Sequence, residues 1–154
     1  MTRAIDPWVE APLADFLRES SARLVLLMTS AGQVVAQHGF TRSLDVMSVA
    51  ALGAAIVSST SEIARLMNLV TLGRVVQQWR AGGVLLAPFR MPHATWIALV
   101  VYGEDTSIGL VQLFFDRLAG DLRTAAPETA IRGPVLAERF EEELNASLRA
   151  LFGR

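Results

Sequence analysis

The residues of this chain that could do chemistry are few, and the most obvious are two histidines. His38 and His93 both fall in predicted turns. A metal site would need carboxylates that converge on them, and the sequence has no HExxH or similar spacing. The chain contains no cysteine, and all its basic residues other than histidine are arginine. Thiolate catalysis, cysteine zinc sites, Schiff-base lysines and a phosphate-binding lysine are therefore excluded.

Acidic and hydroxyl side chains form three short clusters. Glu104 and Asp105 could act as an acid/base pair, or could cap the helix that follows. The hydroxyl run from Ser58 to Ser61 lies inside a predicted helix without a nearby base, and the Glu141–Glu143 run is typical of a solvated helix face. No glycine-rich nucleotide-binding motif and no GxSxG sequence is present. We therefore expect no catalytic site, no metal and no cofactor.

Composition indicates one globular domain. The chain has 154 residues, of which 52% are hydrophobic and 19% charged, with a net charge of −1. A balanced charge argues against a nucleic-acid-binding surface. Acidic residues interrupt the first twenty positions and no apolar run is long enough to span a bilayer, so we expect a cytoplasmic protein without a membrane span.

Hydrophobic periodicity predicts an α+β fold with helices and strands in mixed order. We expect a domain over residues 8–125, a linker over 126–134 and a C-terminal helix over 135–152. Within the domain, a short helix precedes strands 23–29 and 33–37, the helix 45–68, strands 73–80, 84–89 and 95–102, and a last helix. Strands 23–29 and 95–102 are apolar on both faces, which predicts neighbouring positions at the sheet centre. Strand 73–80 is half polar and should lie at an edge.

The helix Asp45–Asn68 has two different stripes. Large apolar residues recur at helical spacing and are expected to face the sheet: Val49, Leu52, Ile56, Ile63 and Met67. The opposite side is mostly small and is expected to face partners: Ala51, Ala54, Ser58, Ser61, Glu62 and Arg65. Together with the edge strand, it predicts a homodimer formed by one symmetry operation. The expected dimer contacts are Ala51, Ala54, Ala55, Ser58, Arg74, Val75, Val76, Gln77 and Gln78.

Several local sequences together resemble the roadblock family, and within it the bacterial MglB proteins. The resemblance covers about residues 10–125 and rests on VLLMTSAGQVVAQHG (Val25–Gly39), the small-residue helix from Ser48, and EDTSIGLVQL (Glu104–Leu113). A trailing helix after a Gly-Pro linker resembles the C-terminal extension of some MglB proteins.

This resemblance implies both a fold and a function. It implies a roadblock/profilin-like five-stranded antiparallel sheet of order 2-1-5-4-3, with one long helix on one face and two on the other. It implies dimerisation through strand three and the long helix. It also implies binding of a Ras-like GTPase, MglA, on the paired long helices, and faster GTP hydrolysis through remodelling of the switch regions without an inserted arginine.

We therefore expect a homodimeric activator of an MglA-like GTPase in cell polarity or motility control, which is not itself an enzyme. The expected GTPase contacts are Ala54, Ser58, Ser61, Glu62 and Arg65, and the C-terminal helix could add Phe140, Leu144, Leu148 and Leu151. Two alternatives remain open: a roadblock scaffold that binds another roadblock subunit or a receptor, and a small-molecule sensor with a pocket between sheet and helices.

Overall fold

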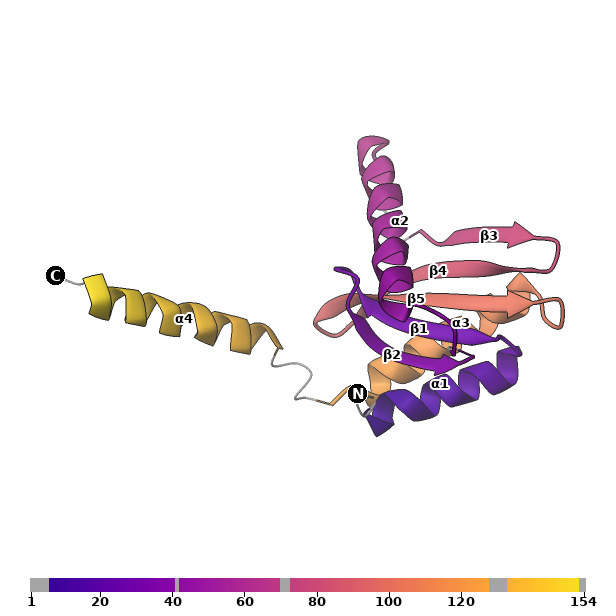
Figure 1. The fold of residues 1–154 in the computed structure, drawn as a ribbon, viewed down its shortest axis with the longest axis horizontal. Helices are drawn as coiled ribbons and strands as arrows, with labels where there is room; N and C mark the ends of the chain where they lie inside the picture. Colours follow the sequence, from indigo (N-terminus) through magenta and orange to yellow (C-terminus); the bar gives the residue numbers. More distant parts are fainter. Residues whose placement is uncertain (1–5, 41, 70–72, 128–132, 153–154) are drawn as a thin grey trace.

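The structure is a computed structural model that describes residues 6–40, 42–69, 73–127 and 133–152, with the backbone only for 133–141. It contains four helices and five strands within these ranges (Figure 1). The helices are α1 (Pro7–Ser20), α2 (Val46–Leu66), α3 (Ile108–Ala125) and α4 (Gly133–Phe152). The strands are β1 (Leu24–Thr29), β2 (Val34–Gly39), β3 (Val75–Trp79), β4 (Gly82–Met91) and β5 (Ala94–Gly103).

The five strands form one antiparallel sheet of order β2-β1-β5-β4-β3, which confirms the predicted fold class and strand order. β1 pairs with β5 in a regular register from Leu24↔Val101 to Thr29↔Trp96. All residues of β1 from Leu24 to Met28 are buried, because helices cover the sheet on both sides of this strand. β3 pairs only with β4 among the described strands, so one of its edges is unpaired.

Alternating residues of the strands feed two separate cores. Val25 and Leu27 point toward α1 and α3, which contribute Leu13 and Phe115 to the larger core. Leu26 and its neighbours on the other face point toward α2. One long helix therefore covers one face of the sheet and two helices cover the other, as Figure 1 shows and as the roadblock resemblance implies.

α2 packs on the sheet with its small residues, which corrects the expectation from sequence. Its buried positions are Ala50, Gly53, Ala54 and Val57. A Cβ on Gly53 would lie 3.2 Å from Leu86 Cδ2 and 3.3 Å from Leu99 Cδ1, so the helix backbone approaches the sheet closely. The large stripe that we expected to be buried is largely exposed: Leu52 is 65% exposed, Ile56 45%, Ile63 56% and Met67 64%.

The first turn of α2 is held by its N-cap residue. The Asp45 carboxylate accepts hydrogen bonds from the Ser48 backbone N–H (3.2 Å) and from the Ser48 hydroxyl (2.6 Å). The hydroxyl bond, with the backbone bond second, lowers the pKa of Asp45 below its ordinary value. The cap therefore stabilises the fold above the pKa of Asp45 in the unfolded chain, and this contribution is lost as pH falls through the folded pKa.

We expect Ser48→Ala to raise the pKa of Asp45 toward its ordinary value, because the largest of its hydrogen-bond contributions disappears while the backbone bond stays. An NMR titration of the Asp45 carboxyl in both proteins measures the shift. Ser59→Ala is the control, since that hydroxyl donates to the Ala55 carbonyl further along the helix and should leave Asp45 unchanged. An identical Asp45 pKa in wild type and Ser48→Ala would contradict the assignment.

α4 lies apart from the domain in Figure 1. Its described side chains, from Glu142 to Phe152, are all exposed, including Leu144, Leu148 and Leu151. The side chain of Phe140 and part of the expected linker, residues 128–132, lie outside the described residues. The helix therefore presents an apolar stripe that the described part of the domain does not cover.

Candidate partner-binding surface

The two histidines lie on different elements and do not form a site. His38 lies in β2 opposite Val25, not in a turn as expected, whereas His93 lies in the turn between β4 and β5. Within the ranges that the structure describes, no three side chains of His, Asp or Glu come together in a way that could hold a metal ion. Glu104 and Asp105 lie in the turn before α3, and Ser107 rather than either carboxylate caps that helix, through a 3.3 Å bond from the Leu110 N–H to its hydroxyl.

The hydroxyl run of α2 is engaged with its own helix at two positions. Ser59 Oγ donates to the Ala55 carbonyl at 2.8 Å, and Thr60 Oγ1 donates to the Ile56 carbonyl at 2.9 Å. Both are bonds to the preceding turn, a common arrangement for hydroxyl side chains within helices. These two groups are therefore structural, and none of the bonds points to an activated nucleophile.

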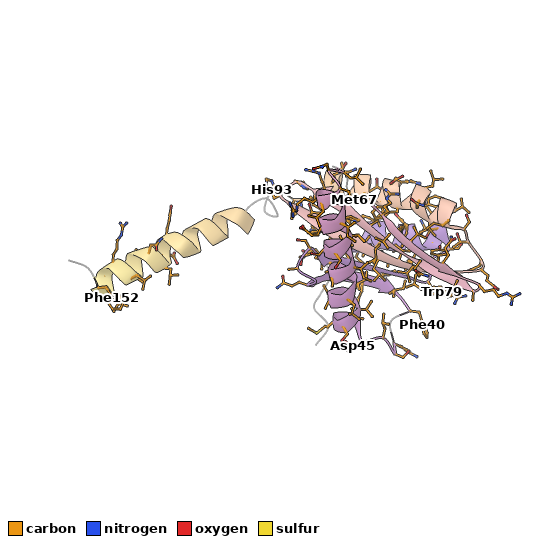
Figure 2. The ribbon with its side chains drawn as sticks, turned by 90° about the horizontal axis from the view of Figure 1, so that it is seen from above. Phe40, Asp45, Met67, Trp79, His93 and Phe152 are labelled. Carbon is orange, nitrogen blue, oxygen red and sulfur yellow. The ribbon has the colours of Figure 1, made fainter. Side chains whose placement is uncertain are left out.

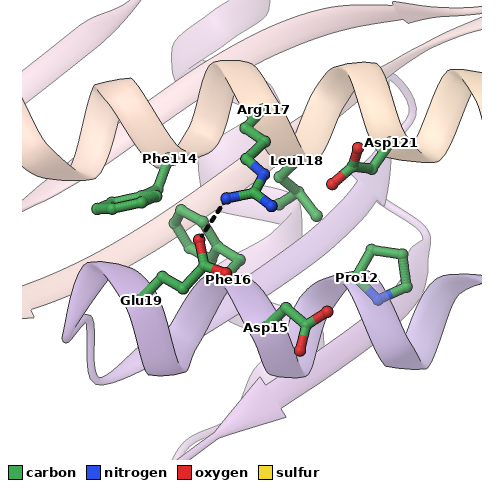
Figure 3. Close-up of a pocket in the computed structure, with 8 residues that line it drawn as sticks. All are labelled: Pro12, Asp15, Phe16, Glu19, Phe114, Arg117, Leu118 and Asp121. Atoms are coloured by element: carbon green, nitrogen blue, oxygen red, sulfur yellow. Dashed lines mark hydrogen bonds and ion pairs between the residues drawn. The ribbon is translucent and has the colours of Figure 1, made fainter.

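Two small hollows lie near α1, and neither has room for a substrate. The groove between α1 and α3 has a volume of about 20 Å³, room for about one water. Figure 3 shows that an ion pair crosses it, with Arg117 Nη1 and Glu19 Oε2 3.0 Å apart. A second hollow of about 70 Å³ lies beside the stacked rings of Trp8 and Trp96, whose centroids are 6.1 Å apart.

A much larger apolar groove lies on the α2 face of the sheet, with a volume of about 580 Å³. Its lining residues come from the start of β1, the segment before α2, α2 itself, and the β3, β4 and β5 strands: Arg23, Leu24, Phe40, Ser43, Leu44, Val49, Trp79, Val84, Leu99 and Val101. Neither Phe40 nor Trp79 carried a sequence signal for a site, so the groove was not predicted at this position. Phe40 is 73% and Trp79 52% exposed, and exposed aromatic side chains that line one groove indicate a contact surface.

One flank of α2 extends the apolar surface away from the groove. Val49 lines the groove, and Ile56, Ile63 and Met67 follow it at intervals of seven and four residues, which places them on the same side of the helix. These three side chains are exposed. We call Val49, Ile56, Ile63 and Met67 the apolar flank of α2. It is most of the stripe that the sequence assigned to the protein core.

The outward side of α2 is small and polar. Ala51, Ala55 and Ser58 are exposed there, and Glu62 and Arg65 form an ion pair in which Arg65 Nε lies 3.0 Å from both carboxylate oxygens. This pairing lowers the pKa of Glu62 and raises that of Arg65. Ser61 is also exposed. Ala54 is not, because only 5% of its surface is accessible, so its expected place in both interfaces is wrong.

The expected dimer residues in β3 and just before it divide into two groups. Val76, Gln77 and Gln78 are exposed at the unpaired edge, and Val75 is half-buried against the α2-side core. Arg74 is engaged within the chain instead. Its guanidinium forms an ion pair with Asp116, donates to Gln112 Oε1 at 3.1 Å and lies 5.0 Å from the centroid of the Phe115 ring. Its side chain is thus held on the opposite face of the sheet, against α3.

α2 is long and apolar enough to cross a membrane by length and composition alone, with a mean hydropathy of 1.5 and 22% of its most apolar window buried. The core helix of a globular domain passes the same test. Here the four buried residues of α2 are packed against the sheet: Ala50, Gly53, Ala54 and Val57. The helix is therefore part of the folded domain, and its exposed apolar residues lie on its other sides.

A five-stranded antiparallel sheet of this order, with one long helix on one face and two on the other, defines the roadblock fold. Solved structures with this fold are similar over most of the chain. Myxococcus xanthus MglB superposes with a TM-score of 0.70 at 20% identity, over 77% of this chain and 94% of that one. The gliding protein MglB from Thermus thermophilus gives 0.67 at 22% identity, over 82% and 93%.

A roadblock/LC7 domain from Streptomyces avermitilis is also similar, with a TM-score of 0.62 at 14% identity, over 72% of this chain and 91% of that one. No family model matches the sequence. None of the curated proteins matches it either. The likeness to solved structures therefore establishes the fold, and the function has to be argued from the surface.

Proposed function

We propose that this chain is a cytoplasmic, homodimeric roadblock protein of the MglB type that binds an MglA-like small Ras-like GTPase and accelerates its GTP hydrolysis. In this role it controls a cell polarity or motility switch. The observation that carries the proposal is the combination of an unpaired β3 edge with a long helix whose large apolar residues are exposed beside it. Such a surface is typical of a protein that works by association. The likeness to MglB structures supports the choice of partner.

An activator of this kind needs no catalytic side chain of its own. A small GTPase already holds the nucleotide and Mg²⁺, and its slow step depends on the arrangement of its switch regions and attacking water. A protein that binds the hydrolysis-competent conformation more tightly than the others shifts the population toward it. The proposal therefore fits a chain whose described histidines and carboxylates do not converge.

We place the GTPase on the exposed small and polar residues of α2, at Ala55, Ser58, Ser61, Glu62 and Arg65. The small side chains leave the helix backbone accessible, and the ion pair supplies the only charges in this set. The wider contact surface includes Ala51, which lies on the same exposed side.

Single-turnover GTP hydrolysis by the small Ras-like GTPase of the same organism tests the proposal. We expect faster turnover with saturating protein than without it, and tighter binding to the GTPase loaded with a non-hydrolysable GTP analogue than with GDP. Binding without faster turnover would support the scaffold alternative instead. Unchanged turnover together with no binding to the GTP state would rule the proposal out.

α4 is proposed as an accessory contact to the GTPase, through Phe140, Leu144, Leu148 and Leu151. We expect a chain that ends after Gly133 to keep the same Tm and the same oligomeric state in light scattering, because the described side chains of α4 are exposed and support no core. Its affinity for the GTPase should fall. A monomeric or unfolded truncated chain would show that α4 belongs to the dimer interface or to the domain.

A further inference from the structure

β3 has little apolar packing to hold it in the sheet. Among the described strands its only partner is β4, and it has five residues. Val75 packs against the core beneath α2, whereas Val76 points to the other face, because it pairs with Leu85 of the larger core. Val76 is 39% exposed there, so α1 and α3 leave the middle of β3 open. Short strands at a sheet edge depend on such packing for stability.

Two polar side chains connect β3 to the rest of the domain on this open face. Arg74, just before the strand, and Gln78, near its end, lie two residues before and after Val76, and alternate side chains of a strand point to the same face. Each of them bonds to a partner on an element other than β4. We call these two connections the Arg74 tie and the Gln78 tie.

The Arg74 tie is ionic and holds the start of β3 against α3. The Arg74 guanidinium forms an ion pair with Asp116, donates to Gln112 Oε1 at 3.1 Å and lies 5.0 Å from the centroid of the Phe115 ring. These three partners lie within five residues of one helix, so the guanidinium has a single well-defined place on α3. Asp116 is exposed, so dissolved salt reaches the ion pair and weakens it.

The Gln78 tie is neutral and holds the other end of β3 to β5. Gln78 Nε2 donates to the Tyr102 hydroxyl at 3.1 Å, across β4, which lies between the two strands. The tyrosine passes Gly83, where a Cβ would lie 2.5 Å from the hydroxyl oxygen, so only glycine leaves room for this bond. Tyr102 is buried in the larger core and is thus a fixed anchor. Figure 2 shows Trp79, the last residue of β3, away from α2, so this end of the strand is held from elsewhere.

We infer that Arg74 and Gln78 are positioning residues, which fix β3 on its open face and keep its unpaired edge in the extended form that a second copy requires. The consequence for pairing rests on the proposed homodimer, whereas the two ties are a property of the single chain. The Arg74 tie also gives the homodimer a point of control. A ligand on the α3 side that binds Asp116 or Gln112 would release Arg74 and lower the population of chains whose edge can pair.

Native-state hydrogen exchange tests the ties in the single chain. At protein concentrations below the dimer dissociation constant, the exchange rate of the β3 amides that bond to β4 measures how often the strand opens. We expect Arg74→Met and Tyr102→Phe each to raise this rate about 10-fold, while the amides of β1 keep their wild-type rates. Added NaCl should raise the β3 rate in wild type and in Tyr102→Phe but not in Arg74→Met, since only the Arg74 tie is ionic.

Two further variants separate the tie from a general loss of charge. Arg90→Met is the matched control, because Arg90 is exposed on the neighbouring strand β4, and it should leave β3 exchange at the wild-type rate. Asp116→Asn should speed β3 exchange by itself but add little to Arg74→Met, because the two residues act as one pair. Wild-type β3 exchange in both Arg74→Met and Tyr102→Phe would overturn the inference, and so would full additivity of Arg74→Met and Asp116→Asn.

The dimer dissociation constant gives a second readout, which separates this inference from the proposed homodimer. If β3 opens with an equilibrium constant K and only the closed strand pairs, the apparent dissociation constant rises by the factor (1 + K)², because both chains must be closed. We expect the double variant Arg74→Met/Tyr102→Phe to follow this relation in sedimentation equilibrium, with K taken from hydrogen exchange. A much larger rise would overturn the inference, since Arg74 or Tyr102 would then contact the partner directly. If wild type is a monomer at every concentration, the homodimer fails and the exchange rates alone decide whether the ties exist.

Discussion

Replacing Val76 with aspartate is expected to leave the chain folded but monomeric. Val76 lies near the centre of β3, and 39% of its surface is exposed at the unpaired edge. When an edge strand pairs with its own copy across a twofold axis, a residue near that axis lies close to the same residue of the partner. Each dimer would then hold two carboxylates in proximity, and like charges across an interface cost several kcal/mol. We expect the dissociation constant to rise by at least ~100-fold.

Sedimentation equilibrium of wild type and Val76→Asp measures this change, and circular dichroism checks that the variant remains folded. Val76→Thr is the matched control, because threonine keeps the β-branched shape and the strand propensity without adding a charge. The Thr variant should dimerise like wild type. A Val76→Asp protein that is folded and still dimeric at low concentration would show that β3 is not the contact between copies.

Replacing Ala54 with arginine is expected to disrupt the fold rather than the dimer. Ala54 is buried in the α2-side core with Leu26, Leu86 and Leu99. Gly53, beside it, shows how close the helix lies to the sheet, and a guanidinium there has neither room nor a partner. A buried, unpaired charge and overpacking are both among the most destabilising single changes, so we expect a loss of at least ~3 kcal/mol in the free energy of unfolding.

Ala55→Arg is the matched variant one position away. Ala55 points outward, so this protein should unfold at the wild-type Tm and remain a dimer, but it should lose GTPase binding because the long side chain covers the small surface. Thermal unfolding, light scattering and GTPase affinity of the pair separate the two roles. An Ala54→Arg protein with wild-type stability would contradict the packing of α2. Full GTPase binding by Ala55→Arg would place the GTPase elsewhere.

Much of the fold could be predicted because strands and helices carry different periodicities. β1 and β5 are continuously apolar and lie together at the sheet centre, whereas the polar residues Gln77 and Gln78 place β3 at an edge. Element ends were less predictable. The helix α3 begins after Ser107 and not after Glu104 or Asp105, since several neighbouring residues are competent caps and only the path of the chain selects one.

The orientation of α2 could not be predicted, because both of its sides are compatible with burial. The sequence contains a stripe of large apolar residues, such as Ile56 and Ile63, and a stripe of small ones, such as Ala50 and Ala54. Burial normally follows size, which favours the large stripe. The sheet instead accepts the small stripe, since Leu86 and Leu99 fill the space against Gly53 and leave none for larger side chains. Only the opposing surface decides this, and it is remote in sequence.

The pairing of β1 with β5 also governs how this chain acquires its structure. β1 leaves the ribosome early, but its central partner, which includes Val101, follows only after α2, β3 and β4 have been made. Until then β2 is the only strand that can pair with β1, so the other edge of β1 stays unpaired. Contacts so distant in sequence slow folding and prolong the exposure of aggregation-prone segments. In the proposed homodimer, two chains made on the same message would therefore meet as completed domains, and the joining of their β3 edges would be the last step of assembly.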